Sequence, residues 1–320
     1  MRTLILTFNE IGIVQVVDHG DFLLFVLKGT GTLDPFVHSP LVARSPFMTH
    51  TSLISFWRIL WQLGCRDIQM RYKGSFLGLF WSLLTPVLNV VLYTFLFSVV
   101  FKSQWGEEMH TAATAPGVNT AHSQYSIILF TGLILHAFLA DILVRSCWVV
   151  TQQANLVKKV VFPLSVLPAV VVFAGVFQLL VSGVVLFVGL LMLGADLHGS
   201  MLTLPLLCLP LAVMGLGLAW ILAALGVFVR DLGQIMGWLV TALMFSAPIL
   251  YPLKTISASW GPWLYLNPLT FVVEEMRHVI FVGVWPNWGG WWVYSLASVM
   301  VALLGAKFFD WTKEGFAEVL

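Results

Sequence analysis

An uncharged run at residues 74–101 limits the folds open to this chain more than any other feature. Arg71 and Lys73 precede the run, and Lys102 ends it. As a helix, at about 1.5 Å per residue, it would be roughly 40 Å long, which exceeds the ~30 Å hydrocarbon core of a bilayer. We therefore predict a membrane-spanning helix. Because Lys and Arg are retained on the cytoplasmic side, this helix starts inside the cell.

The composition agrees with a membrane protein. Hydrophobic residues make up 59% of the chain and charged residues 10%, against about 25% charged residues in a soluble domain. The net charge of +1 argues against nucleic acid as a partner, since that binding needs clustered cations. No disulfide is expected, because the topology below places the three cysteines in the cytoplasm or in the membrane.

The first 47 residues differ from the rest, since they are more polar and their longest apolar run is 22–27. We interpret them either as a short, poorly packed cytoplasmic extension or as the product of a misassigned start upstream of Met48. Residues 52–73 then alternate polar and apolar side chains at spacings of three and four, which is typical of an amphipathic helix. Its Trp and Arg residues suit the membrane–water interface. A helix packed on the protein's own cytoplasmic face is the alternative.

Five further apolar segments follow the first span, at 125–144, 169–193, 201–228, 232–251 and 291–306. The second span contains His136 and Asp141, and ionisable groups inside a membrane suggest function. Asp141 lies near the cytoplasmic end, however, where it could instead be solvated or paired with Arg145. A short cytoplasmic helix is expected between the second and third spans, up to Pro163.

Residues 256–288 are apolar, but glycines and prolines divide them into pieces too short to cross a bilayer. Backbone groups freed by such breaks cannot face lipid, so we predict a re-entrant hairpin. On a helix, Glu274 and Arg277 would be neighbours, and we expect them to form a structural pair. The predicted fold is therefore an all-α integral membrane protein with six transmembrane helices, an N-terminal interfacial amphipathic helix and a re-entrant hairpin before the last span.

The distribution of positive charge supports this topology. Outside residues 1–47, ten Lys and Arg residues lie in the predicted inner segments, and only Lys102, Lys254 and Arg277 lie in the outer ones. That asymmetry favours six spans with both termini in the cytoplasm.

The chain contains no pattern typical of catalysis. It has no GK[ST] triplet and so no phosphate-binding P-loop. It also lacks a CxxC or HExxH metal motif and any paired carboxylates. We expect no catalytic residue, no metal and no cofactor bound by this chain, so that the energy for active transport would come from another chain.

Two GxxxG motifs, Gly74 to Gly78 and Gly233 to Gly237, could let helices approach closely. If both do so, the first and fifth spans would meet at a subunit seam. Aromatic residues are dense towards the outer face, where they form either an interfacial belt or a surface on which sugar rings stack. The candidates for a glycan path are Trp81, Tyr93, Tyr251, Trp260 and Trp263.

Four segments together carry a resemblance to a known family: RDIQMRYKGSFLGLFWSLLTPVLNVVLYTFLFSVVF (66–101), VKKVVFP (157–163), VRD (229–231) and YLNPLTFVVEEMRHVIF (265–281). They resemble the membrane subunit of type 2 ABC exporters of bacterial polysaccharides such as O-antigen, capsule and teichoic acid. The resemblance covers residues 52–310. It implies a homodimer in the bacterial inner membrane, paired with two copies of a separate ATPase that uses ATP and Mg²⁺, and exporting a lipid-linked glycan.

The resemblance also implies roles for particular residues. It divides the chain into the extension (1–47), a gate helix (48–74), a six-span domain (75–310) and a cytoplasmic tail (311–320). Arg71, Tyr72 and Lys73 become candidates for the gate and for binding the pyrophosphate that links lipid to sugar. The candidates for coupling to the ATPase are Gln152, Asn155, Lys158 and Lys159.

Two other functions remain open at this point. The same fold could export a drug or a simple lipid, and a narrow, sealed seam without aromatic residues would favour that function. A membrane-embedded transferase acting on lipid-linked sugar would instead need carboxylates gathered at one membrane face, and the sequence shows no such group.

Overall fold

The computed structural model describes residues 7–8, 13–18, 21–26, 50–96, 120–154, 163–253 except 193 and 196, and 261–320. The chain forms two compact units, Met1–His50 and Thr51–Leu320. In the first unit, β1 (Thr7–Phe8), β2 (Ile13–Asp18) and β3 (Asp21–Val26) form an antiparallel sheet in the order β1-β2-β3. β-branched and aromatic residues favour these strands. These strands were not predicted from the sequence, and both interpretations of residues 1–47 stay predictions.

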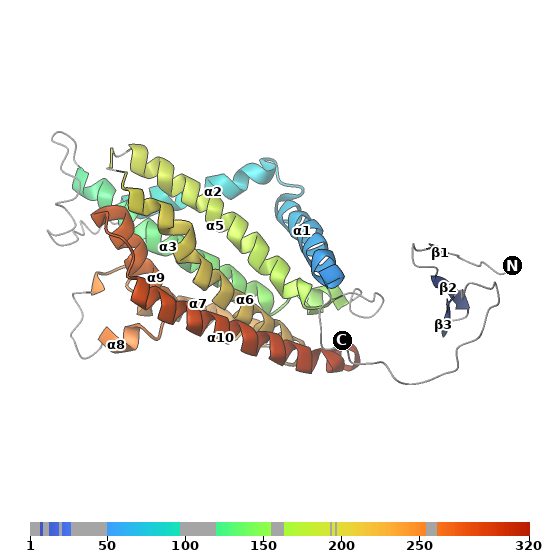
Figure 1. Ribbon diagram of the computed structural model, residues 1–320. Helices are drawn as coiled ribbons and strands as arrows, with labels where there is room; N and C mark the ends of the chain where they lie inside the picture. The colour runs from blue at the N-terminus through green and yellow to red at the C-terminus, as the bar shows by residue number, and fades with distance from the viewer. Residues whose placement is uncertain are drawn as a thin grey trace. The chain divides into compact units, whose positions relative to one another are not determined.

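Every described element of the second unit is helical, as predicted for the membrane part of the chain (Figure 1). The elements are α1 (His50–Tyr72), η1 (Gly78–Phe80), α2 (Trp81–Thr94), α3 (Thr120–Ser146), η4 (Thr151–Gln153), α5 (Val166–Met192), η5 (Gly199–Thr203), α6 (Leu204–Phe228), α7 (Leu232–Ser246), α8 (Gly261–Leu264), α9 (Pro268–Arg277), the π-helical η7 (His278–Val282), α10 (Trp288–Thr312), η8 (Lys313–Gly315) and α11 (Phe316–Val319).

Four stretches of the described chain are long and apolar enough to cross a membrane: Ser126–Ser146, Val166–Met192, Gly199–Phe228 and Trp288–Gly315. They coincide with the predicted second, third, fourth and sixth spans. Two shorter apolar helical stretches, Gly78–Thr94 and Leu232–Ser246, lie where the first and fifth spans were predicted. The protein is therefore a multi-pass membrane protein.

Several helix ends differ from their predicted positions. α7 ends at Ser246 rather than at residue 251, two residues before Pro248, which cannot donate a helical hydrogen bond. α5 begins at Val166, before the predicted residue 169. Pro168 is tolerated there because the first turn of a helix has no use for its missing N–H. In the predicted cytoplasmic helix, at 146–163, residues 147–150 form a turn and 151–153 form η4, whereas residues 155–162 lie outside the described residues.

The first GxxxG motif does not lie on one helix, so the helical spacing on which that interpretation depended is absent. Gly74 and Gly78 adopt φ values of +87° and +53°, and a Cβ atom at either position would meet nothing within 4 Å. Gly74 lies in the turn after α1, and Gly78 is the first residue of η1. Both positions suit glycine, because glycine adopts positive φ without a steric penalty. α2 therefore begins at Trp81, later than the uncharged run suggested. In the second motif, a Cβ at Gly233 would meet the Trp148 side chain, and one at Gly237 would meet nothing.

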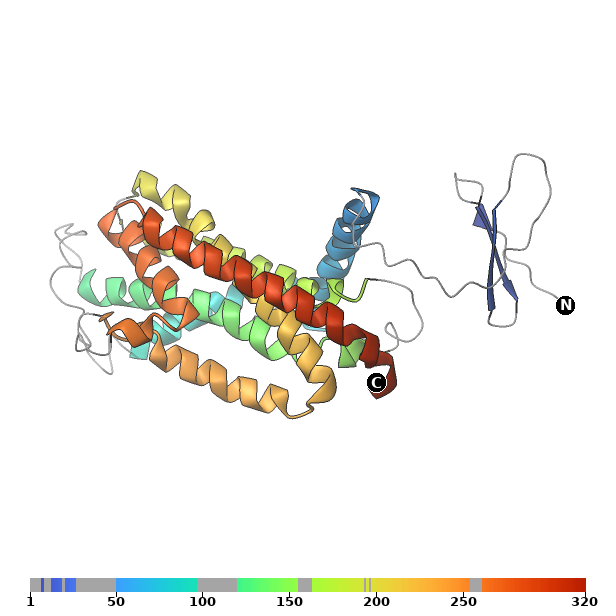
Figure 2. The same ribbon diagram turned by 60° about the horizontal axis from the view of Figure 1, so that its bottom comes forward.

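A close approach between α6 and α10 involves other glycines. A Cβ on Gly217 would lie 2.6 Å from the Cα of Ala302 in α10, and one on Gly305 of α10 would collide with the backbone of Gly217. Figures 1 and 2 show α6 and α10 running side by side. Small residues permit this contact because no side chain separates the two backbones.

α3 is the central helix of the bundle (Figure 2). It packs against α2, α5, α6, α7 and α9, and many of its apolar side chains are buried, with Leu129, Leu135 and Ile142 fully so. His136 on α3 donates from Nε2 to the backbone oxygen of Val240 on α7 at 3.0 Å. The imidazole of His136 thus has a hydrogen-bond partner on α7 inside the bundle.

The C-terminal residues, which include the predicted cytoplasmic tail, pack onto the bundle. α10 continues to Thr312, beyond the predicted end at residue 306. Phe316 of α11 is fully buried, and its ring centroid lies 5.5 Å from that of Phe309 and 6.0 Å from that of Phe228. Burial of an aromatic ring of this size stabilises the docked position.

Candidate functional site

One face of α1 packs on α5. Leu60 and Ile68 are buried, and a Cβ at Gly64 would overlap the ring of Phe173 on α5. Leu60 forms a core cluster with Val166, Ala169 and Val170 at the start of that helix. Trp57 and Trp61 are each 64% exposed. Figures 1 and 2 show α1 outside the bundle, beside the first turns of α5.

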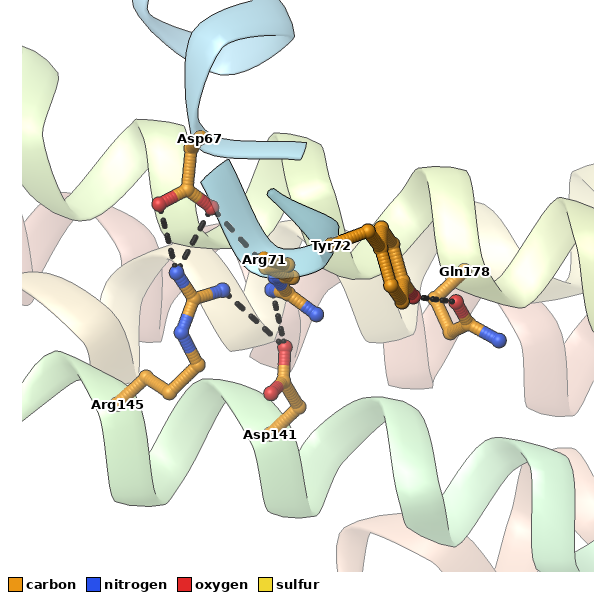
Figure 3. A network of polar contacts seen from close by, with 6 residues as sticks. All are labelled: Asp67, Arg71, Tyr72, Asp141, Arg145 and Gln178. Carbon is orange, nitrogen blue, oxygen red and sulfur yellow. Dashed lines mark hydrogen bonds and ion pairs between the residues drawn. The ribbon is translucent and has the colours of Figure 1, made fainter. Parts of the chain in front are cut away.

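Charged side chains then join α1 to α3 (Figure 3). Arg145 Nη2 on α3 donates to both carboxylate oxygens of Asp67 on α1, at 2.9 and 2.7 Å. Arg71 Nη2 on α1 donates to Asp141 Oδ2 on α3 at 2.8 Å. Two longer contacts complete the set: Arg71 Nε to Asp67 Oδ2 at 3.6 Å and Arg145 Nη1 to Asp141 Oδ2 at 3.5 Å. We call Asp67, Arg71, Asp141 and Arg145 the four-charge cluster.

The four-charge cluster is electrically balanced and partly shielded from water. Its side chains are 23% to 30% exposed. Burial raises the pKa of Asp67, and the charge of Arg71 opposes that rise. Because desolvation offsets much of the attraction in a shielded ion pair, we expect the cluster to contribute little net stability. The predicted partner of Asp141, Arg145, is present, but Arg71 makes the shorter contact.

A second polar contact joins the end of α1 to α5. Tyr72 OH donates to Gln178 Oε1 at 3.2 Å, and Gln178 Nε2 donates to the backbone oxygen of Ser82 on α2 at 2.9 Å. Figure 3 shows the Tyr72 side chain pointing to Gln178 beside the four-charge cluster. We call Tyr72, Gln178 and Ser82 the amide bridge. It connects three helices through one side chain.

The three gate candidates thus have different surroundings. Arg71 is engaged by two carboxylates and Tyr72 by an amide. Lys73 is exposed, in the turn that leads to α2. Among the coupling candidates, Gln152 is exposed in η4. Asn155, Lys158 and Lys159 lie outside the described residues.

The described aromatic candidates lie on α2, on α8 and in the segment after α7. Trp81 begins α2 and is 37% exposed, whereas Tyr93 near the end of that helix packs against the main core. Tyr251 lies after α7 and donates from its hydroxyl to the backbone oxygen of Phe245. Trp263 on α8 is 65% exposed. Trp260 lies outside the described residues.

Arg277 is 1% exposed and makes more contacts than the predicted pair. Its Nη1 lies 3.4 Å from Glu274 Oε1. It also donates to three backbone oxygens, those of Pro248 at 2.5 Å, Ile249 at 2.8 Å and Ile128 at 3.3 Å. The guanidinium therefore joins α9 to α3 and to the segment after α7.

Sequence reasoning missed Asp67 and Gln178. Asp67 and Arg71 follow Leu60 and Gly64 at helical spacing, which places these charges on the packed face of α1. A carboxylate on an apolar face signals a buried partner. Gln178 is the one amide in α5, whose other residues are apolar except for Ser182. A polar group in a predicted span is a comparable signal.

Comparisons with known proteins add to this geometry. The profile of the ABC-2 type transporter family matches residues 58–281, which include α1 from Arg58 onwards and the whole of α9. An O-antigen export system permease protein, RfbA, from Myxococcus xanthus is 28% identical over 270 residues, covering 83% of this chain and 96% of that protein. A protein of the same name from Klebsiella pneumoniae is 26% identical over 256 residues, covering 80% of this chain and 92% of its own length.

Proposed function

Because this chain belongs to the ABC-2 type transporter family, we propose that it is the permease subunit of an ABC exporter for a lipid-linked polysaccharide. The observation that carries the proposal is the similarity to O-antigen export permeases along nearly the whole length of those proteins. Moving a hydroxyl from water into hydrocarbon without a hydrogen-bond partner costs about 4 to 8 kcal/mol. A polysaccharide must therefore pass between helices, while its lipid can stay in the bilayer.

The proposed topology has six spans. The four long apolar stretches are joined by α2 and α7, the two shorter apolar helices, and both termini lie in the cytoplasm of a bacterium. At about 1.5 Å per residue, the ten residues of α9 reach half-way through a bilayer core of ~30 Å. That length supports a re-entrant hairpin. The exposed Trp57 and Trp61 of α1 support a position at the inner membrane surface.

The energy would come from a separate subunit, since the sequence has no GK[ST] triplet. In the proposed assembly, two copies of this chain pair with two copies of an ABC ATPase, and the region around Gln152 transmits the ATPase motion. Inside-out vesicles test this proposal. With the ATPase partner present, ATP should protect added lipid-linked polysaccharide from an external glycosidase, and the purified permease alone should hydrolyse no ATP.

Two results would contradict the proposal. ATP hydrolysis by the isolated chain would show that the energy source is this chain and not a separate ATPase subunit. Transport of a simple phospholipid at the rate of the lipid-linked polysaccharide would show that the glycan is not the cargo.

Arg71 and Lys73 are the proposed site for the pyrophosphate of the cargo, because charge-assisted hydrogen bonds to phosphate are strong. Replacing both with alanine should reduce binding of lipid-linked glycan about tenfold or more, since each hydrogen bond to a charged group contributes about 1.5 to 3 kcal/mol. Binding is measured with the detergent-purified complex and a fluorescent lipid-linked glycan.

The control for this experiment is Arg145→Ala, because Arg71 also belongs to the four-charge cluster. That variant disrupts the cluster from the α3 side and leaves both gate cations in place. Unchanged binding in the double variant, or an equal loss in Arg145→Ala, would remove Arg71 and Lys73 as the phosphate site.

A further inference from the structure

The turn between α1 and α2 bends at two glycines. Gly74 and Gly78 have positive φ, and neither would place a Cβ within 4 Å of another residue. Phe76 between them is fully exposed, at 102%. A turn with so few packing contacts does not by itself fix the direction of α1 relative to α2. That direction must be set by contacts on either side of the turn.

The amide bridge supplies such a contact on each side. Tyr72 is the last residue of α1, and Ser82 is the second residue of α2. Both bind the same amide of Gln178 on α5. The backbone oxygen of Ser82 can only accept a hydrogen bond, so it fixes Nε2 towards α2 and leaves Oε1 facing Tyr72.

The contact with Ser82 has a specific cause in the sequence of α2. In a regular helix the oxygen of Ser82 would accept from the N–H four residues later, but that residue is Pro86, inside α2. Proline has no backbone N–H, and Ser82 is buried, with a relative exposure of 5%. Gln178 therefore donates to the very carbonyl that Pro86 leaves without a helical partner, and loss of that bond would leave a buried acceptor unsatisfied.

The contact with Tyr72 is of another kind. It joins two side chains, and a tyrosine hydroxyl that leaves it can bond to water instead, so opening it costs only the small net free energy of one hydrogen bond. The contact between Gln178 and Ser82 is thus required by α2, whereas the contact between Gln178 and Tyr72 can open and close.

We propose that Gln178 is a positioning residue for export, whose amide is held by Ser82 on α2 and presents Oε1 as the docking point for Tyr72 of α1. α1 moves about the turn at Gly74 and Gly78 when the Tyr72 contact opens. The four-charge cluster holds the same end of α1 to α3, so the two contacts must open together. The part of this inference that concerns export depends on the proposed function, and the part that concerns the position of α1 does not.

The two halves of the amide bridge can be separated by substitution. Tyr72→Phe removes only the contact with α1. Gln178→Leu removes both contacts, and adding Pro86→Ala to it restores a helical N–H for the Ser82 oxygen. We expect Gln178→Leu to lower the melting temperature of the permease–ATPase complex and Gln178→Leu/Pro86→Ala to recover it.

The position of α1 is then measured directly. Spin labels at Gln62 on α1 and Gln152 in η4, two exposed positions, report their separation in a chain whose three cysteines are replaced by alanine. Tyr72→Phe and Gln178→Leu/Pro86→Ala should both widen the distance distribution. The population with α1 released should rise about fivefold relative to the docked one, the ratio that one neutral hydrogen bond ordinarily contributes.

Export by the same complexes in inside-out vesicles should change in both variants, although their melting temperatures match that of the wild type. Pro86→Ala alone, which keeps the Tyr72 contact, is the matched control and should leave the distance distribution narrow. A narrow distribution in both test variants, or recovery of the docked position by Pro86→Ala in the Gln178→Leu background, would overturn the proposal. Absence of export by the wild-type complex would count against the proposed function, whereas the distance distributions would still decide the role of Gln178.

Discussion

Replacement of Arg277 by methionine is expected to destabilise the protein by about 2 to 6 kcal/mol. The side chain is 1% exposed, and it is the donor for the backbone oxygens of Pro248 and Ile249. Each buried acceptor that loses its donor costs about 1 to 3 kcal/mol. Since folded domains are stable by about 5 to 15 kcal/mol, the variant should lose a large share of its stability. Thermal unfolding of the detergent-purified chain, followed by size-exclusion chromatography, measures the loss.

Two matched variants separate the contributions of Arg277. Arg277→Lys keeps the charge but cannot donate in several fixed directions at once, so it should lie between wild type and Arg277→Met. Glu274→Gln tests the predicted pair, whose separation is 3.4 Å and whose carboxylate is 20% exposed; about 1 kcal/mol or less is expected. If Glu274→Gln were as harmful as Arg277→Met, the ion pair rather than the carbonyls would be the main contact.

The second large effect is expected from Gly217→Leu. A Cβ at this position would lie 2.6 Å from the backbone of Ala302 in α10, and a backbone cannot rotate away as a side chain can. α10 would have to move off α6, against which most of its packing lies. Overpacking ordinarily costs about 1 to 3 kcal/mol, and a backbone collision belongs at or above the upper end of that range. The readout is again the melting temperature of the purified protein.

Gly183→Leu is the control for this substitution. Gly183 lies within α5, another long apolar helix, and a Cβ there would meet nothing within 4 Å. It should be neutral or slightly stabilising, because leucine favours helix more than glycine does. The smaller change Gly217→Ala should cost less than Gly217→Leu but more than Gly183→Leu. Equal melting temperatures for Gly217→Leu and Gly183→Leu would mean that α6 and α10 do not meet at Gly217.

Much of the membrane unit could be predicted from the sequence because hydropathy is a local property. The long apolar stretches of the second, third, fourth and sixth spans coincide with α3, α5, α6 and α10. The ends of helices were less predictable. Gly74 and Gly78 looked like a helix-packing motif, but they bend the chain before α2. The same spacing of glycines occurs in both settings, and only the backbone dihedral angles distinguish them.

The candidate site was predicted in part. The basic cluster singled out Arg71 and Tyr72, and the polar residues of the second span singled out Asp141. Their contacts could not be derived, since Asp141 lies 70 residues from Arg71, and Gln178 lies 106 residues from Tyr72. The pairing of Glu274 with Arg277 followed from helical spacing, but the three carbonyls that Arg277 binds come from distant segments.

By itself, the order of residues determined that this chain enters the membrane and which stretches are apolar enough to cross it, because the transfer of a side chain from water to lipid depends on that side chain alone. The fold decided which polar groups are satisfied inside the protein and by which partners. Pro86 leaves the oxygen of Ser82 without a donor, and only the packing of α5 against α2 brings Gln178 to it. A hydrogen bond or a glycine contact forms only when two helices meet, and the positions of those meetings are set by the packing of the whole bundle.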